Sequence, residues 1–109
     1  MAGLHANNTT GMTYDVLVGA DRSVTVRVGG ELDMTNVETL STAIAPALEP
    51  RPARLVVDVA ELGFADSSAI ALWVQWAKAV PEIELRDARP FLRRVVETMG
   101  LSEMLKVTP

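Results

Sequence analysis

The run Leu55-Val56-Val57-Asp58-Val59 constrains the fold of this chain more than any other segment. A short apolar run rich in β-branched side chains is typical of a strand that is buried on both faces. Such strands occur in sheets that are covered by helices. Amphipathic, helix-like patterns precede and follow this run in the sequence, so we expect an α/β fold.

Two strands are predicted before this run, over residues 14–18 and 23–28. In the second of them, Val24, Val26 and Val28 alternate with polar residues, which indicates a strand with one buried face. Because only a short turn separates the two segments, we expect them to form an antiparallel hairpin. We expect Gly29-Gly30 to close this hairpin.

The first helix is expected to begin at Thr35 or Asn36, since both residue types are good N-caps. Glu38 lies three residues after Thr35, a spacing that predicts a capping box. Pro46 removes a backbone donor, so this helix is expected to kink or end near that position.

The second half of the chain predicts two more helices and one more strand. A helix is expected over residues 67–79, with Pro81 ending it, and a short strand follows around residues 83–85. Pro90 suits the first position of the last helix, and Gly100 is a natural C-terminal stop.

The predicted order of elements is therefore β-β-α-β-α-β-α. Strands that alternate with helices predict a mostly parallel sheet, here of four to five strands packed by helices, with the initial hairpin adding an antiparallel pair. Residues 1–13 are rich in Gly, Asn and Thr, and we expect them to form a flexible tail. Residues 14–109 are expected to form a single domain.

Composition narrows the classes of function. The chain has 109 residues, no cysteine and a net charge of −4, which argues against disulfides, thiol catalysis and nucleic acid as a partner. No apolar stretch is long enough to span a membrane, and the start does not resemble a signal peptide, so we expect a cytoplasmic protein without membrane insertion. No phosphate-binding glycine loop or nucleophile system is present. We therefore expect a binding protein that is not an enzyme and needs no cofactor or metal.

The segment Phe64-Ala65-Asp66-Ser67-Ser68-Ala69 is the strongest candidate for a functional site. Asp66 and Ser67 both suit an N-cap, so a helix N-terminus follows a buried strand here, and its free amides favour a negative group. A helical wheel places Ser68 near the solvated position of Gln75, and Ser67 nearer the core. Ser68 is therefore expected to be the more exposed hydroxyl and the better site for phosphorylation.

Simpler interpretations exist for this segment and for others. By local sequence alone, Asp66-Ser67-Ser68 is merely a helix cap. Asp33 and Asp66 might pair as carboxylates for acid–base work or magnesium, but no other part of such a site accompanies them. The two tryptophans could either pack in the core or dock a partner: Trp73 and Trp76. Four arginines could either form a solvated helix face or contact an acidic partner: Arg86, Arg89, Arg93 and Arg94.

Three segments together resemble the STAS domains, specifically the anti-sigma factor antagonists. The stretch from Val56 through Phe64-Ala65-Asp66-Ser67-Ser68-Ala69-Ile70 resembles the signature of that family, Gly30-Glu31-Leu32-Asp33 resembles its first conserved loop, and residues 99–105 resemble its closing Gly-Leu segment. The three matches come in family order and cover about residues 14 to 107.

This resemblance implies a partner switch. The unphosphorylated domain would bind an anti-sigma factor that is also a serine kinase, and phosphorylation of Ser68 would end that binding until a phosphatase reverses it. Ala69 stands where the family commonly has glycine, and its methyl group could crowd the kinase. The residues expected to contact the partner are Asp33, Thr35, Asn36, Asp66, Ser67, Ser68 and Ala69. The alternative is a cytoplasmic STAS subunit of a lipid-transport ABC complex, which docks on an ATPase without phosphorylation.

Overall fold

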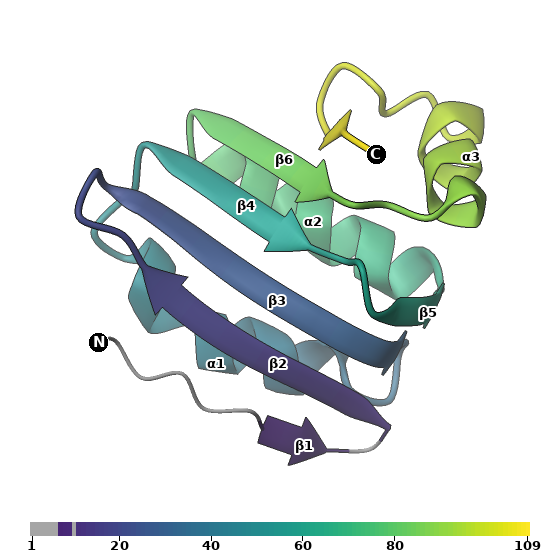
Figure 1. Cartoon of the computed structure of the whole chain (residues 1–109), viewed down its shortest axis with the longest axis horizontal. Helices are drawn as coiled ribbons and strands as arrows, with labels where there is room; N and C mark the ends of the chain where they lie inside the picture. Colours follow the sequence, from purple (N-terminus) through teal and green to yellow (C-terminus); the bar gives the residue numbers. More distant parts are fainter. Residues whose placement is uncertain (1–6, 10) are drawn as a thin grey trace.

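The computed structural model describes residues 7–9 and 11–109, and its order of long elements confirms the expected α/β architecture (Figure 1). Residues 1–6 and 10, which belong to the expected tail, lie outside the described residues. The elements are β1 (Asn7–Thr9), β2 (Met12–Val18), β3 (Ser23–Leu32), α1 (Val37–Leu48), β4 (Arg54–Asp58), β5 (Leu62–Ala65), α2 (Ser67–Ala79), β6 (Glu82–Arg86), α3 (Pro90–Thr98) and β7 (Lys106–Val107).

The strands form one mixed sheet in the order β1-β2-β3-β4-β6-β7, with β5 paired to the far end of β3. β2 and β3 form the expected antiparallel hairpin, whereas β4, β5, β6 and β7 all pair in parallel. Three short strands were not predicted: β1, β5 and β7. Each is short and gains its hydrogen bonds only from a partner strand, so local sequence gives little sign of it.

The first two strands are longer than predicted. β2 begins at Met12, two residues before the expected start at Tyr14. β3 does not end at Gly29-Gly30 but continues to Leu32, so that prediction was wrong. Gly30 has φ +83° and its backbone crosses so close to Gly11 that a Cβ would lie 2.3 Å from the Gly11 carbonyl oxygen. Glycine is therefore needed there to let two strands approach, rather than to end one.

Both long helices, α1 and α2, cover the same face of the sheet (Figure 1). Leu55 and Val57 of β4 join the core on that face, as do the alternating valines of β3. The expected burial of β4 on both faces is confirmed, although α1 and α2 cover only one of these faces. Val56 points to the opposite face, where its register neighbours are Thr25 and Glu84. Its side chain is buried there too, with 2% relative exposure.

Charged side chains cross that opposite face. Arg54 and Arg86 both contact Glu84, at 2.5 Å and 3.3 Å, and the Thr108 hydroxyl donates to the same carboxylate at 2.9 Å. Desolvation raises the pKa of Glu84, but the hydrogen bonds from Thr108, Arg54 and Arg86 outweigh it and leave the pKa below its ordinary value. Asp58, at the end of β4, accepts a hydrogen bond from the Ala60 N–H, as a strand-end residue satisfied by a loop amide.

α1 starts and ends close to the predicted positions, but it is not capped as predicted. Asn36 is the N-cap, but no side-chain hydrogen bond caps the helix, so the expected capping box from Thr35 to Glu38 was wrong. The side chains of Thr35 and Asn36 instead turn back to the preceding loop. The helix also continues through Pro46 to Leu48, because the lost hydrogen bond lies in the last turn and Glu49 N–H still bonds to Ala45 O.

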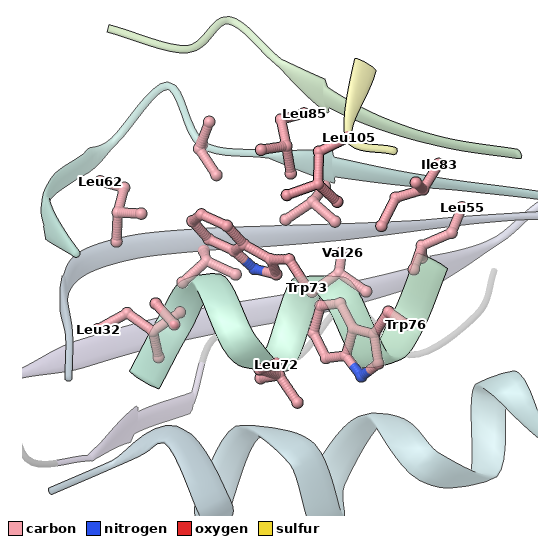
Figure 2. Close-up of a cluster of buried hydrophobic side chains, with 14 of the residues drawn as sticks. Val26, Leu32, Leu55, Leu62, Leu72, Trp73, Trp76, Ile83, Leu85 and Leu105 are labelled. Carbon is pink, nitrogen blue, oxygen red and sulfur yellow. The ribbon is translucent and has the colours of Figure 1, made fainter. Parts of the chain in front are cut away.

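The core lies between α2 and the sheet (Figure 2). Trp73 is fully buried and Trp76 is 5% exposed, so packing is the correct interpretation for both indoles. α3 begins at Pro90 and ends at Thr98, with the expected stop Gly100 just beyond it, where Leu101 N–H bonds to Val96 O and Gly100 N–H to Glu97 O. Within residues 7–9 and 11–109, no helix has both the length and the apolar character that crossing a bilayer requires.

Candidate functional site

Asp66 starts α2 by capping it. One carboxylate oxygen, Oδ1, accepts hydrogen bonds from the backbone N–H groups of Ser68 at 2.9 Å and Ala69 at 3.4 Å. These are two of the amides that a helix leaves unpaired at its N-terminus. The residue itself remains extended, with φ −103° and ψ −172°. The bounds of this helix, Ser67–Ala79, are those expected from the sequence.

The loop between β3 and α1 is held in shape by its own polar side chains. Asn36 is almost completely buried, and its amide accepts from Asp33 N–H at 3.0 Å and donates to Glu31 O at 2.9 Å. Asp33 Oδ1 accepts from the hydroxyl and the N–H of Thr35. These two hydrogen bonds, the hydroxyl's first, hold the pKa of Asp33 below its ordinary value.

The second oxygen of Asp66 joins the two segments. Its Oδ2 accepts a hydrogen bond from the Met34 N–H at 3.2 Å. The Asp66 N–H donates in turn to Leu32 O at 3.3 Å, next to the parallel pairing of Leu32 with Ala65. The parallel β3–β5 pair is the element that brings the loops of Asp33 and Asp66 together.

The two serines differ from the expectation. Ser67 is exposed, whereas Ser68 is only partly exposed, so the prediction that Ser68 is the more exposed hydroxyl was wrong. Ser68 lines a shallow hollow of about 320 Å³ between α1 and α2, together with Glu38, Leu72 and Gln75. The helical wheel did place Ser68 on the side of Gln75. The helical wheel describes one helix alone, so it could not show that α1 packs beside the side of α2 that carries Ser68.

Two residues expected to contact a partner are buried. Ala69 has no exposed surface and Asn36 has 1%. Direct contact was therefore the wrong role for both side chains. Asn36 shapes the loop that carries Asp33 and Thr35, and Ala69 packs α2 against the core. The methyl group of Ala69 also points into the core, so it does not crowd the surface around Ser68.

The sequence analysis missed Met34 at this site, and it named Phe64 as part of the candidate segment without predicting that its side chain is exposed. Met34 is 76% exposed and lies in the loop joined to Asp66, and Phe64 is 48% exposed on β5. A signal for both was present, since each is a large apolar residue within a short polar or glycine-containing segment. We define the docking surface as the exposed or partly exposed residues of these two segments: Asp33, Met34, Thr35, Phe64, Asp66, Ser67 and Ser68.

The docking surface lacks the features of a catalytic or metal centre. Over the described part of the chain, no group of three or more His, Asp or Glu side chains is placed to hold a metal ion. Asp66 uses both carboxylate oxygens on backbone amides, and Asp33 uses one on Thr35. The arrangement therefore suits recognition of a protein surface rather than acid–base chemistry.

A family model described as "Mlab, STAS domain" matches residues 17–107. The chain belongs to the STAS domain family. Curated relatives agree with this: proteins named anti-sigma-B factor antagonist from several strains of Staphylococcus aureus are 26% identical over 91 residues, which is 80% of this chain and 84% of theirs. These relatives are named for antagonism of another protein.

Solved structures share the fold of this STAS domain. A crystal structure of an anti-sigma factor antagonist from Mycobacterium paratuberculosis superposes with a TM-score of 0.80 at 24% identity, covering 90% of this chain and 86% of that one. The anti-sigma factor antagonist SpoIIAA in its unphosphorylated form gives a TM-score of 0.75 at 22% identity, over 88% of both chains. Its phosphorylated form, described as a Bacillus cell fate determinant, gives 0.69 over 88% and 91%.

Proposed function

We propose that this STAS domain is an anti-sigma factor antagonist that acts in the cytoplasm. It binds an anti-sigma factor with serine kinase activity, and this binding frees a sigma factor and so regulates transcription. The observation that carries the proposal is the placement of Ser67 and Ser68 at the capped N-terminus of α2, hydrogen-bonded through Asp66 to the loop of Asp33. The names of the curated relatives support it.

The docking surface has the composition of a protein interface. Met34 and Phe64 expose large apolar side chains, which would anchor contact with a partner. Asp33 and Asp66 surround them with negative charge, and no Lys or Arg occurs in residues 28–50 or 55–77. We therefore expect the partner to present an apolar pocket with a basic rim.

Phosphorylation of Ser68 would switch this surface off. The free end of the α2 dipole tolerates a negative group, so the domain would stay folded. The phosphoryl group adds about −1.5 to −2 charges beside the exposed apolar side chains of the docking surface, and contact with a partner there would require its desolvation. It would also fill the hollow between Ser68 and Glu38. A phosphatase would restore binding.

The structure also explains how a kinase could choose between the serines. Ser67 is the more exposed, but Ser68 sits in a hollow whose walls come from α1 and α2. A kinase that docks on α1 as well as on the loop of Asp33 would reach Ser68 and recognise both elements. Ala69, with its methyl group in the core, leaves this approach open.

The proposal is tested by incubating the purified protein with anti-sigma kinases and ATP, and mapping the phosphorylated residue by mass spectrometry. We expect phosphate on Ser68 alone, no phosphate on Ser68→Ala, and unchanged transfer to the matched control Ser67→Ala. Transfer to Ser67, or equal transfer to Ser68→Ala, would contradict the assignment of Ser68.

The alternative function, a STAS subunit of a lipid-transport ABC complex, predicts a different result. Such a subunit would bind its ATPase with the same affinity whether Ser68 is serine, alanine or aspartate. Stable association of the purified domain with a transport ATPase, together with no transfer from any anti-sigma kinase that binds it, would favour this alternative.

A further inference from the structure

Met34 is the most exposed large apolar side chain among the described residues. Its relative exposure is 76%, against 54% for Val18 and 48% for Phe64. Its side chain does not pack against the hydrophobic core. Its backbone is nevertheless held in place, because its N–H donates to Asp66 Oδ2 at 3.2 Å. The thioether sulfur is therefore presented to solvent at a fixed point of the docking surface.

The other methionines in the described part of the chain are less accessible. Met12 is fully buried, and Met99 and Met104 are 49% and 42% exposed. Met99 and Met104 lie between α3 and β7, outside the docking surface. Of these four sulfur atoms, that of Met34 is the one that a small oxidant in solution reaches most easily.

Few other side chains compete with Met34 for an oxidant. The chain contains no cysteine, so its sulfur atoms all belong to methionine. The indoles, which can also be oxidised, are protected by the core, since Trp73 is fully buried and Trp76 is 5% exposed. The accessible redox chemistry of the described residues is therefore concentrated on exposed methionines, with Met34 foremost.

We propose that Met34 is a site of reversible oxidation, at which a peroxide weakens binding of the protein partner. This inference rests on the proposed function, since it requires a partner that contacts the docking surface. The Met34 sulfur attacks one oxygen of hydrogen peroxide, so that an S–O bond forms as the O–O bond breaks. Sulfur gives up two electrons, and the second peroxide oxygen takes up the hydrogen of the first and leaves as water. The product is methionine sulfoxide.

The reverse step makes this modification a switch. Methionine sulfoxide reductases, one for each epimer, return the sulfoxide to the thioether. Two thiols are oxidised to a disulfide in this step, and the sulfoxide oxygen leaves as water. The exposure of Met34 that admits the oxidant also leaves the sulfoxide open to the reductase.

Oxidation of Met34 changes the docking surface without changing the fold. The sulfoxide is a polar hydrogen-bond acceptor, so an apolar pocket of the partner receives it only with a cost of desolvation. The core stays intact because the Met34 side chain is not part of it. The hydrogen bond to Asp66 also stays, because it comes from the backbone N–H. The domain thus responds to oxidants at a residue separate from Ser68.

The first measurement is the rate of sulfoxide formation at each methionine. The full, unphosphorylated chain is treated with hydrogen peroxide, and its peptides are quantified by mass spectrometry. We expect Met34 to be oxidised first, Met99 and Met104 more slowly, and Met12 only when the core opens. Oxidation of Met99 or Met104 before Met34 would overturn the assignment of the site.

The second measurement is the affinity of an anti-sigma factor for the domain before and after oxidation, with the peroxide removed before the partner is added. We expect binding at least about tenfold weaker after oxidation, since a polar group then enters an apolar contact. Circular dichroism should be unchanged, and treatment with both reductases and dithiothreitol should restore the affinity. Equal affinity before and after complete oxidation of Met34 would overturn the proposal.

Substitutions assign the effect to one sulfur atom. Met34→Leu is apolar and lacks sulfur, so peroxide treatment should leave its own affinity as it was before treatment. Met34→Gln places a polar group there and should weaken binding without any oxidant. The matched control, Met99→Leu with Met104→Leu, should lose affinity on treatment as the wild type does.

Two outcomes separate this inference from the proposed function. Loss of affinity in peroxide-treated Met34→Leu would overturn the role of Met34 while leaving the partner switch in place. Failure of the untreated wild-type domain to bind any anti-sigma factor would contradict the proposed function, and this inference with it.

Discussion

The backbone N–H of Met34 donates a hydrogen bond to Oδ2 of Asp66, which lies 32 positions further along the chain. Through Oδ1 the same carboxylate caps α2 at Ser68 and Ala69. One side chain therefore fixes both the helix that carries the serines and the loop that carries Met34. This link makes the docking surface a single unit, although its residues come from two separate segments.

Replacement of Asp66 should weaken both the fold and the docking surface. Asp66→Ala removes the cap and the link to Met34, so we expect the free energy of unfolding to fall by about 1–2 kcal/mol in urea denaturation. Asp66→Asn keeps an oxygen for the cap but turns an NH₂ group toward the Met34 N–H if the cap is retained, so we expect a smaller loss. Asp66→Ala with wild-type stability would show that neither contact matters.

Three glycines should respond to alanine in a definite order. Gly30 has φ +83° and no space for a Cβ beside Gly11, whereas Gly100 has φ +72° with no atom within 4 Å, and Gly63 has ordinary space. We expect Gly30→Ala to destabilise most, Gly100→Ala by about 1–2 kcal/mol from the left-handed backbone alone, and Gly63→Ala least. The measurement is the urea midpoint of each variant, and a Gly30→Ala protein more stable than Gly100→Ala would contradict the close approach.

Glu84 should make stability depend on acid pH. Its pKa is lowered from 4.5 in the folded protein, so its contribution to stability is fully present above pH 4.5 and is lost as the pH falls through the folded value. Asp33, and Asp21 through its hydrogen bond with Ser23, have lowered pKa values and add to the same trend.

The measurement compares the free energy of unfolding of wild type and Glu84→Gln between about pH 6 and about pH 3. We expect the variant to be less stable than wild type at the upper end and the two curves to approach each other at the lower end. Parallel curves across this range would show that the contacts of Glu84 with Arg54, Arg86 and Thr108 do not stabilise its charged form.

Local signals explain which parts of the fold could be predicted. The bounds of α2 follow from Asp66 as N-cap and Pro81 just beyond its end, both of which act on neighbouring residues only. β5 and β7 depend instead on pairing with β3 and β6, and the continuation of β3 past Gly30 depends on contact with Gly11. Such non-local contacts leave no periodic pattern in a short segment.

The candidate site likewise contains residues that local sequence predicts and residues whose burial depends on distant elements. Asp33, Asp66 and both serines could be found from cap chemistry and from resemblance to the family. The burial of Asn36 and the partial burial of Ser68 could not, because each depends on a second element, the end of β3 for Asn36 and α1 for Ser68. Met34, and the exposure of Phe64, were missed because exposure of an apolar side chain is a property of the folded surface.

The most direct test of the proposed partner switch is the affinity of one anti-sigma factor for the unphosphorylated domain and for the same domain phosphorylated at Ser68. Calorimetry should give binding at least about 100-fold weaker for the phosphorylated form, since burying a charged phosphoryl group at an apolar contact adds a desolvation cost. Far-ultraviolet circular dichroism should show that both forms are equally folded. Equal affinity of the two folded forms would contradict the switch.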